Sequence, residues 1–142
     1  MIAFDVNVFV TAHVAGQEHH VVALEQIEGA MNRGETIGVS DLVLSGYVRI
    51  VTNHRYLHDP DTVDEALAFC DALKARPNVR VLISGPRHWD IFADLCRVTE
   101  ARGGIVSDAY HAAMAVEHNC EWVSFDRDFA RFPGLRWRSP LD

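Results

Sequence analysis

The sequence contains few cysteines and no long hydrophobic run. Cys70, Cys96 and Cys120 are the only cysteines among 142 residues, and none forms a C-x-x-C pair, so buried thiols in a reducing compartment are expected. No segment approaches the roughly 18 consecutive apolar residues of a membrane span. The apolar opening segment reaches Asp5 with no basic region before it, unlike a signal peptide. These absences predict a cytoplasmic protein with no membrane association.

Positive charge is also scarce. The chain has 13 basic residues, of which only Lys74 is a lysine, against 20 acidic residues, and its net charge is −7. This balance disfavours a protein that coats nucleic acid through bulk positive charge, so any nucleic-acid binding should be local. The sequence also lacks G-x-x-x-x-G-K, G-x-G-x-x-G and G-x-S-x-G. Nucleotide-driven motors, dinucleotide-binding enzymes and serine hydrolases are therefore disfavoured.

The apolar content and the order of the hydrophobic patterns predict a fold class. Apolar residues make up 49% of the chain, with no linker and no internal repeat, so we expect a single domain over residues 1–142. The predicted strands are residues 2–4, 36–39, 79–83, 122–125 and 135–137, and the predicted helices are one after Asp5 and residues 21–31, 42–50, 63–75, 87–102 and 107–119. This alternation predicts an α/β fold with a central, mostly parallel sheet covered by helices on both faces.

Carboxylates occur where such a fold binds ligands. Asp5 follows the first predicted strand, Asp126 follows the strand expected to end at residue 125, and Asp128 comes two residues later. Asp108 stands at the predicted start of a helix. Each of these aspartates alone could be a helix cap or a turn residue. Their convergence would favour a metal site, because clustered carboxylates repel one another without a cation, and oxygen ligands suit Mg²⁺ or Mn²⁺.

These segments resemble a known family. Residues 2–8 (IAFDVNV), 107–113 (SDAYHAA) and 124–129 (SFDRDF) resemble PIN-domain ribonucleases, and the match spans the whole chain. Residues 44–53 and 129–135 resemble one subgroup of VapC-type toxins of bacterial type II toxin–antitoxin pairs. The resemblance implies a PIN-like three-layer α/β/α fold and a Mg²⁺- or Mn²⁺-dependent endoribonuclease that cuts RNA, such as tRNA or rRNA. It also implies a homodimer inhibited by a cognate VapB-type antitoxin.

The resemblance assigns roles to individual residues. Asp5, Asp108 and Asp126 match the metal-binding carboxylates of the family, and Asp128 matches an acidic position that assists catalysis in some members. Asn7 matches the polar residue two positions after the first aspartate. Either Asp126 or Asp128 could accept the proton of the attacking water.

One position departs from the family pattern. Many PIN domains carry a glutamate where this chain has Gly46, and Asp41 should face too far around its helix to replace that side chain. The site could therefore hold one metal ion more firmly than two. Ser107, in the second motif, is expected to support the site.

Positive charge near the site would have to come from arginine. The candidate rim residues are Arg49, Arg55, Arg87, Arg102, Arg127, Arg131, Arg136 and Arg138. Most of these should serve solubility or ion pairing, and Arg127, between two site aspartates, is the expected exception. No base-stacking residue is predicted, since tryptophan and tyrosine usually belong to the core of such a domain. His54 and His58 have helical metal-pair spacing but should lie where the helix has ended.

Two other functions fit parts of the sequence. A haloacid-dehalogenase-like phosphatase also places an aspartate after its first strand, but Asn7 departs from its D-x-D motif and Lys74 is a poor match for its lysine. A catalytically decayed module that binds RNA or an antitoxin would account for Gly46. The three retained aspartates, Asp5, Asp108 and Asp126, argue against decay.

Overall fold

The computed structural model describes residues 1–142 and contains one five-stranded sheet in the order β3-β2-β1-β4-β5. The strands are β1 (Ile2–Phe4), β2 (Ile37–Ser40), β3 (Val79–Leu82), β4 (Glu121–Val123) and β5 (Arg136–Arg138). Every neighbouring pair is parallel. The predicted α/β class is confirmed, and the sheet is parallel throughout.

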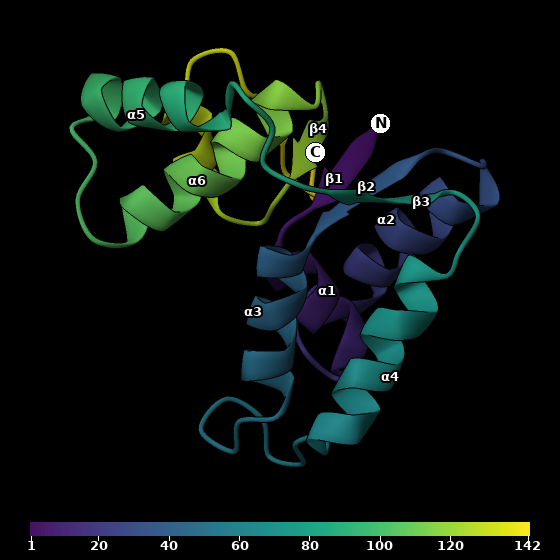
Figure 1. Cartoon of the computed structure of the whole chain (residues 1–142). Coiled ribbons are helices and arrows are strands. Elements are labelled where there is room, and N and C mark those ends of the chain that lie inside the picture. Colours follow the sequence, from purple (N-terminus) through teal and green to yellow (C-terminus); the bar gives the residue numbers. More distant parts are fainter.

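Helices cover both faces of the sheet (Figure 1). They are α1 (Val6–His13), α2 (His20–Asn32), α3 (Asp41–Val51), α4 (Val63–Lys74), α5 (His88–Thr99), α6 (Gly104–Glu117) and the 3₁₀ helix η1 (Arg127–Arg131). The first four pack together on one side, and α5 and α6 pack against each other on the other side. The chain steps in one direction from β1 to β3 and then returns past β1 to β4. Because such crossovers are right-handed, the reversal moves the later helices to the opposite face.

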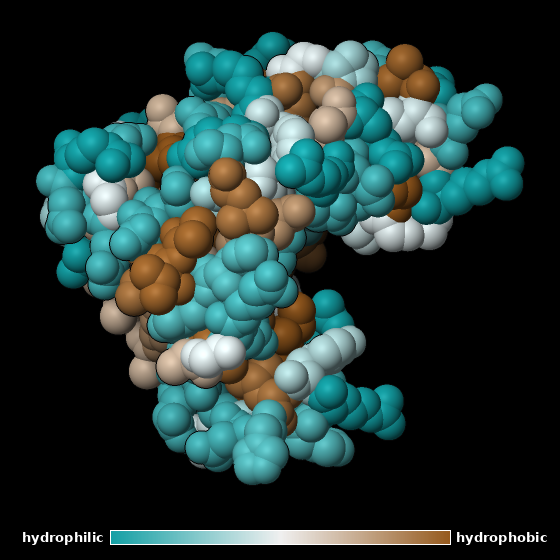
Figure 2. All heavy atoms as spheres, turned by 180° about the vertical axis from the view of Figure 1, so that it is seen from behind, coloured by the Kyte–Doolittle hydropathy of each residue, from teal (hydrophilic) through white to brown (hydrophobic).

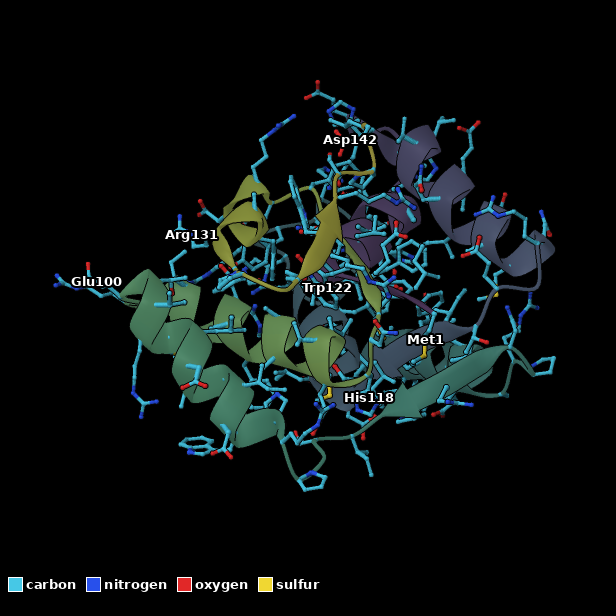
Figure 3. The ribbon with its side chains drawn as sticks, turned by 90° about the horizontal axis from the view of Figure 1, so that it is seen from above. Met1, Glu100, His118, Trp122, Arg131 and Asp142 are labelled. Atoms are coloured by element: carbon cyan, nitrogen blue, oxygen red, sulfur yellow. The ribbon has the colours of Figure 1, made fainter.

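The core fills both interfaces between sheet and helices. Strand β1 is buried along its whole length. On one side Phe4 meets Phe9 edge to face, with ring centroids 5.9 Å apart, and on the other Trp122 packs against Phe129 at 5.5 Å. Figure 3 shows Trp122 inside the molecule, beside α6. Helix α6 presents a buried row of small side chains, Ala109, Ala112, Ala113 and Ala115, which lets it approach the sheet closely.

Two predicted boundaries near the site aspartates were wrong. Helix α6 begins at Gly104, three residues before the predicted start, because Gly103 turns the chain with φ of 54° and serves as its N-cap. Strand β4 ends at Val123 and not at Phe125, because the Phe125 N–H donates to Asn7 Oδ1 at 3.2 Å and leaves the strand direction. Both corrections change how the nearby aspartates are held.

The features expected to be unrelated to chemistry lie away from the sheet edge that carries the aspartates. His54 and His58 are exposed in the loop 52–62, beyond the end of α3, as predicted. All three cysteines are free thiols. None of the helices has the length and apolar character that crossing a bilayer requires.

Candidate functional site

The candidate site lies where the direction of strand order reverses. Strands β1 and β4 are parallel neighbours, yet β1 leads into α1 on one face of the sheet and β4 leads into η1 on the other. The two outgoing segments separate and open a crevice at the carboxyl end of the sheet, which is the usual ligand position in such folds. Asp5 follows β1, and Asp126 follows the short segment after β4.

Asp5 caps a helix and also belongs to the hydrogen-bond network between the segments after β1 and β4. Its Oδ1 accepts a hydrogen bond from Val6 N at 2.7 Å, which caps α1, while its Oδ2 accepts one from Ser124 Oγ at 2.6 Å and one from Asn7 Nδ2 at 3.0 Å. Burial raises the pKa of Asp5 to about 6, although the hydrogen bonds from Ser124 and Val6 oppose the shift. The capping role and the site role predicted as alternatives are therefore compatible at Asp5.

Ser124 joins the segments after β1 and β4. Its hydroxyl donates to Asp5 and accepts from Asn7 Nδ2 and from Asp126 N, both at 3.0 Å, so its one donor and two acceptors are all used. Ser124 is fully buried. Sequence reasoning did not assign it a role; the available signal was a hydroxyl at the end of an apolar strand, two residues before Asp126. Asn7, which was predicted to support the site, completes the network.

Asp108 joins this group from α6. It lies inside the helix and caps nothing, so the capping interpretation is wrong for this residue. Burial, followed by the charges of Asp126, Asp5 and Asp128, raises the pKa of Asp108 to about 6. The repulsion shows that carboxylates from three separate segments share one region.

The other two acidic residues have local partners. Asp126 Oδ1 accepts from Asp128 N at 2.8 Å and so caps η1. Asp128 Oδ1 forms an ion pair with Arg131 Nη2 at 2.7 Å. Figure 3 shows Arg131 on the side of the molecule that carries the α5–α6 turn at Glu100. Arg127 is exposed and belongs to none of the ion pairs.

The carboxylate side chains near the sheet edge are of the type that binds a hard divalent cation, but they are not spaced as they would be in a formed metal site. No three acidic, imidazole or thiol side chains stand in a metal-binding group. Asp5, Asp108 and Asp126 supply carboxylate oxygens, the ligand type that Mg²⁺ and Mn²⁺ prefer. Among the charges acting on Asp108, only Arg131 is positive. The negative charges of these three carboxylates repel one another with little positive charge nearby to offset them. The side chains would therefore have to move inward to bind a cation.

A pocket of about 450 Å³ lies between the two helical layers, and its wall includes Val6 and Ser107, the sequence neighbours of Asp5 and Asp108. It is lined by Val6, Leu42, Ser45, Gly46, Arg49, Phe92, Val106, Ser107, Tyr110 and His111. Figure 2 shows this side of the molecule as a deep hollow with hydrophobic atoms at its back and hydrophilic rims. A Cβ at Gly46 would lie 2.9 Å from Val6 Cγ2, so position 46 has no room for a side chain without a shift of Val6. Asp41 does not replace the absent carboxylate, because it pairs with Lys74.

Comparison with known proteins gives consistent matches over the full chain. The family model described as PIN domain matches residues 2–135. Ribonuclease VapC43 of Mycobacterium tuberculosis is 43% identical over 142 residues, covering 100% of this chain and 97% of that protein. Ribonuclease VapC25 of the same organism is 35% identical over 140 residues and covers 99% of each chain.

Solved structures share the fold at lower identity. The crystal structure of VapBC2 from Rickettsia felis, bound to a DNA fragment from its promoter, includes a chain that superposes with a TM-score of 0.71 at 18% identity. The superposition covers 98% of each chain. At this identity the similarity concerns the fold alone.

Proposed function

This chain belongs to the PIN-domain family, and from that premise we propose that it is a VapC-type toxin, a metal-dependent endoribonuclease. The observation that carries the proposal is that Asp5 and Asp126 lie near enough to Asp108, at the reversal of strand order, for their charges to contribute to its raised pKa. Helix capping alone does not account for the group, since Asp108 caps nothing. A cation-dependent reaction on an anionic substrate accounts for it.

The three aspartates would hold Mg²⁺ or Mn²⁺. Such an ion, when bound, lowers the pKa of its water and neutralises charge that develops on a phosphate. Ser124 and Asn7 fix the orientation of Asp5 through three hydrogen bonds within the network. The hydrogen bond from Asp126 N to Ser124 fixes the backbone at the second ligand relative to the first. The fold therefore fixes Asp5 and the backbone at Asp126, and the carboxylate oxygens would move inward to hold a cation.

Asp126 and Asp128 remain the candidates to accept a proton from water. Asp126 Oδ1 accepts the hydrogen bond that caps η1, and Asp128 Oδ1 accepts one from Arg131. The Oδ2 atom of each carboxylate would be available to the site. The ion pair with Arg131 orients the Asp128 carboxylate through Oδ1. The two roles separate experimentally. Loss of Mg²⁺ binding identifies a ligand, and loss of cutting with Mg²⁺ binding retained identifies the acceptor.

RNA would approach an acidic centre through local positive charge. The chain carries a net charge of −7, but Arg49 borders the crevice and Arg127 stands between two of the aspartates. Neither arginine is held in an ion pair, so both guanidinium groups are available to phosphates. We propose structured RNA such as tRNA or rRNA as the substrate, and inhibition of translation and growth as the consequence.

We also propose a VapB-type antitoxin as the partner of a homodimeric toxin. An arginine from a partner could enter the carboxylate group, because its planar fork matches paired carboxylate oxygens and its charge relieves their repulsion. Asp5 and Asp108, with their raised pKa values, are the groups that such a charge would stabilise most.

The comparisons favour the nuclease over the phosphatase alternative. Lys74, the only lysine available for phosphatase chemistry, pairs with Asp41 and with none of the three site aspartates. A decayed, binding-only module remains a distinct outcome of the same experiment that tests the nuclease.

The test is RNA cutting by the purified chain in Mg²⁺, Mn²⁺ or excess EDTA, with the 5′ ends in total bacterial RNA sequenced. We expect cutting that needs either cation, abolished in Asp126→Asn and retained in Asp94→Asn, whose exposed side chain pairs only with Arg97. Asp128→Asn should retain Mg²⁺ binding if Asp128 is the proton acceptor. Undiminished cutting in EDTA would exclude metal dependence, and RNA binding with no cutting would favour the decayed module.

A further inference from the structure

The pocket beside the carboxylates has features that the catalytic group does not explain. Its volume of about 450 Å³ lies within the range of roughly 300–1,000 Å³ that is typical of small-molecule sites. Val6, next to Asp5, and Ser107, next to Asp108, are part of its wall. The pocket therefore borders the two segments that carry Asp5 and Asp108.

One wall of the pocket is a fixed aromatic corner. Phe92 and Tyr110 meet at 65° with centroids 5.7 Å apart, so together they present one ring face and one ring edge. Tyr110 is held by a 3.0 Å hydrogen bond between its hydroxyl and Ser84 Oγ. The ring of His88 is parallel to that of Phe92, with ring centroids 6.5 Å apart. These contacts fix both rings before a ligand binds, which reduces the entropy cost of stacking.

The rest of the wall combines the apolar side chains of Val6, Leu42 and Val106 with polar groups, of which His111 and Arg49 have no side-chain hydrogen-bond partner. His111 stacks on Trp122 at 5.6 Å, and burial lowers its pKa to about 4, so at neutral pH its ring carries one donor and one acceptor nitrogen. Arg49 provides a guanidinium that no carboxylate holds. An apolar peptide side chain would leave these groups unused. A flat heterocycle attached to a phosphate would use the rings, the imidazole and the charge together.

Gly46 is part of the pocket lining, beside Val6. A Cβ at this position would lie 2.9 Å from Val6 Cγ2, so glycine allows the close contact between α3 and Val6. The position where many PIN domains place a glutamate therefore provides a close packing contact, and not a ligand, in this chain.

We infer that this pocket binds one unstacked nucleobase of the RNA, from a nucleotide flanking the scissile phosphate, between the aromatic corner of Phe92 and Tyr110 and the polar wall of His111 and Arg49. The inference rests on the proposed function, because it needs the adjoining carboxylates to act on RNA. It adds a source of sequence preference that the acidic group cannot supply, since carboxylates and a cation contact only the backbone. Recognition of a base turned out of its stack is the usual way that proteins read RNA sequence.

The test combines a filled pocket with a missing base. Ser45 is exposed on the α3 rim, so Ser45→Trp can fill the pocket without altering the core or the carboxylates, and Ser45→Ala is the matched control. Val106→Trp fills it from α6, with Val106→Ala as its control. The probe is a synthetic RNA that carries the best site mapped in total RNA, with an abasic nucleotide placed in turn at the three positions on each side of the cut.

We expect one abasic position to lower kcat/KM of the wild-type chain by at least about fivefold, as the loss of base–aromatic stacking predicts. On intact RNA, Ser45→Trp should have a kcat/KM lower than that of the wild type by a similar factor. For this variant, removing the same base from the RNA should lower kcat/KM no further. Indifference to every abasic position, or fully additive losses, would overturn the inference. A change of oligomeric state, seen by light scattering, that accompanies the loss of activity in the tryptophan variants would also overturn the inference. The pocket would then hold a second copy of the chain. Absence of cutting by the wild-type chain in both Mg²⁺ and Mn²⁺ would instead remove the proposed nuclease itself.

Discussion

Replacing Asp108 with asparagine should make the metal-free protein more stable while it abolishes RNA cutting. Asp108 caps no helix, and burial and neighbouring aspartates disfavour its charge. Asparagine has nearly the same shape and carries no charge. The substitution therefore removes a repulsion and a desolvation penalty without opening a cavity.

The size of the gain follows from the raised pKa of Asp108. A carboxyl whose pKa rises from 3.8 to about 6 on folding binds its proton more tightly in the folded state, so ionisation destabilises the fold as pH rises through this window. Two pKa units correspond to about 3 kcal/mol, and solvent screening of this half-exposed side chain reduces the figure to about 1 kcal/mol. For a chain of this length the melting temperature should rise by about 3 °C.

The measurement is thermal unfolding in EDTA at pH 7.5 and pH 4.5, for the wild type, Asp108→Asn and the control Asp94→Asn. The advantage of Asp108→Asn should be smaller at pH 4.5, because the carboxyl of the folded wild type then carries a proton for more of the time and its charge opposes folding less. Asp94→Asn, which alters an exposed ion pair, should shift the melting temperature by less than about 1 °C. Saturating Mg²⁺ should reverse the order, since a ligand at 100 times its Kd adds about 2.7 kcal/mol to the wild type.

Two results would refute this reasoning. A lower melting temperature for Asp108→Asn in EDTA at pH 7.5 would mean that the carboxylate stabilises the fold. An equal gain at both pH values would mean that ionisation of Asp108 is not the cause.

The remaining predictions concern the hydrogen-bond network and the partner. Ser124→Ala should lower stability by about 2 kcal/mol and cutting by more than tenfold, because Asp5, Asn7 and Asp126 lose a shared partner. Thr52→Ala, which removes a half-buried hydroxyl at the end of α3 away from the sheet, should leave kcat unchanged, and equal losses of cutting in both variants would contradict a positioning role. Expression of the chain alone should arrest growth, and co-expression with the product of an adjacent antitoxin gene should restore it. The affinity of that complex, measured by titration, should fall as the Mg²⁺ concentration rises, because Mg²⁺ and an arginine of the antitoxin would compete for the same carboxylates. An affinity that does not depend on Mg²⁺ would place the inhibitory contact elsewhere.

Local sequence patterns determined the element order and the α/β class. Apolar runs bounded by turn residues defined the strands, and helical spacing of apolar residues defined the helices, because each element must bury one face. The positions of Asp5 and Asp126 after β1 and β4 also followed, since residues at the carboxyl ends of parallel strands share an edge. The sequence motifs were sufficient to indicate the family.

Other features depended on contacts between segments far apart in the chain. The Phe125 N–H bonds to Asn7, 118 residues away, so the end of β4 could not be derived from its local pattern. Ser124 is one hydroxyl in an apolar strand until the fold brings Asp5 and Asn7 to it. In the sequence Gly46 is a missing carboxylate, whereas in the structure it allows Val6 to pack closely against α3 beside a pocket walled by α3, α5 and α6. Periodicity records which face of an element is buried, but which side chains then meet across the crevice depends on how the helical layers pack on the sheet.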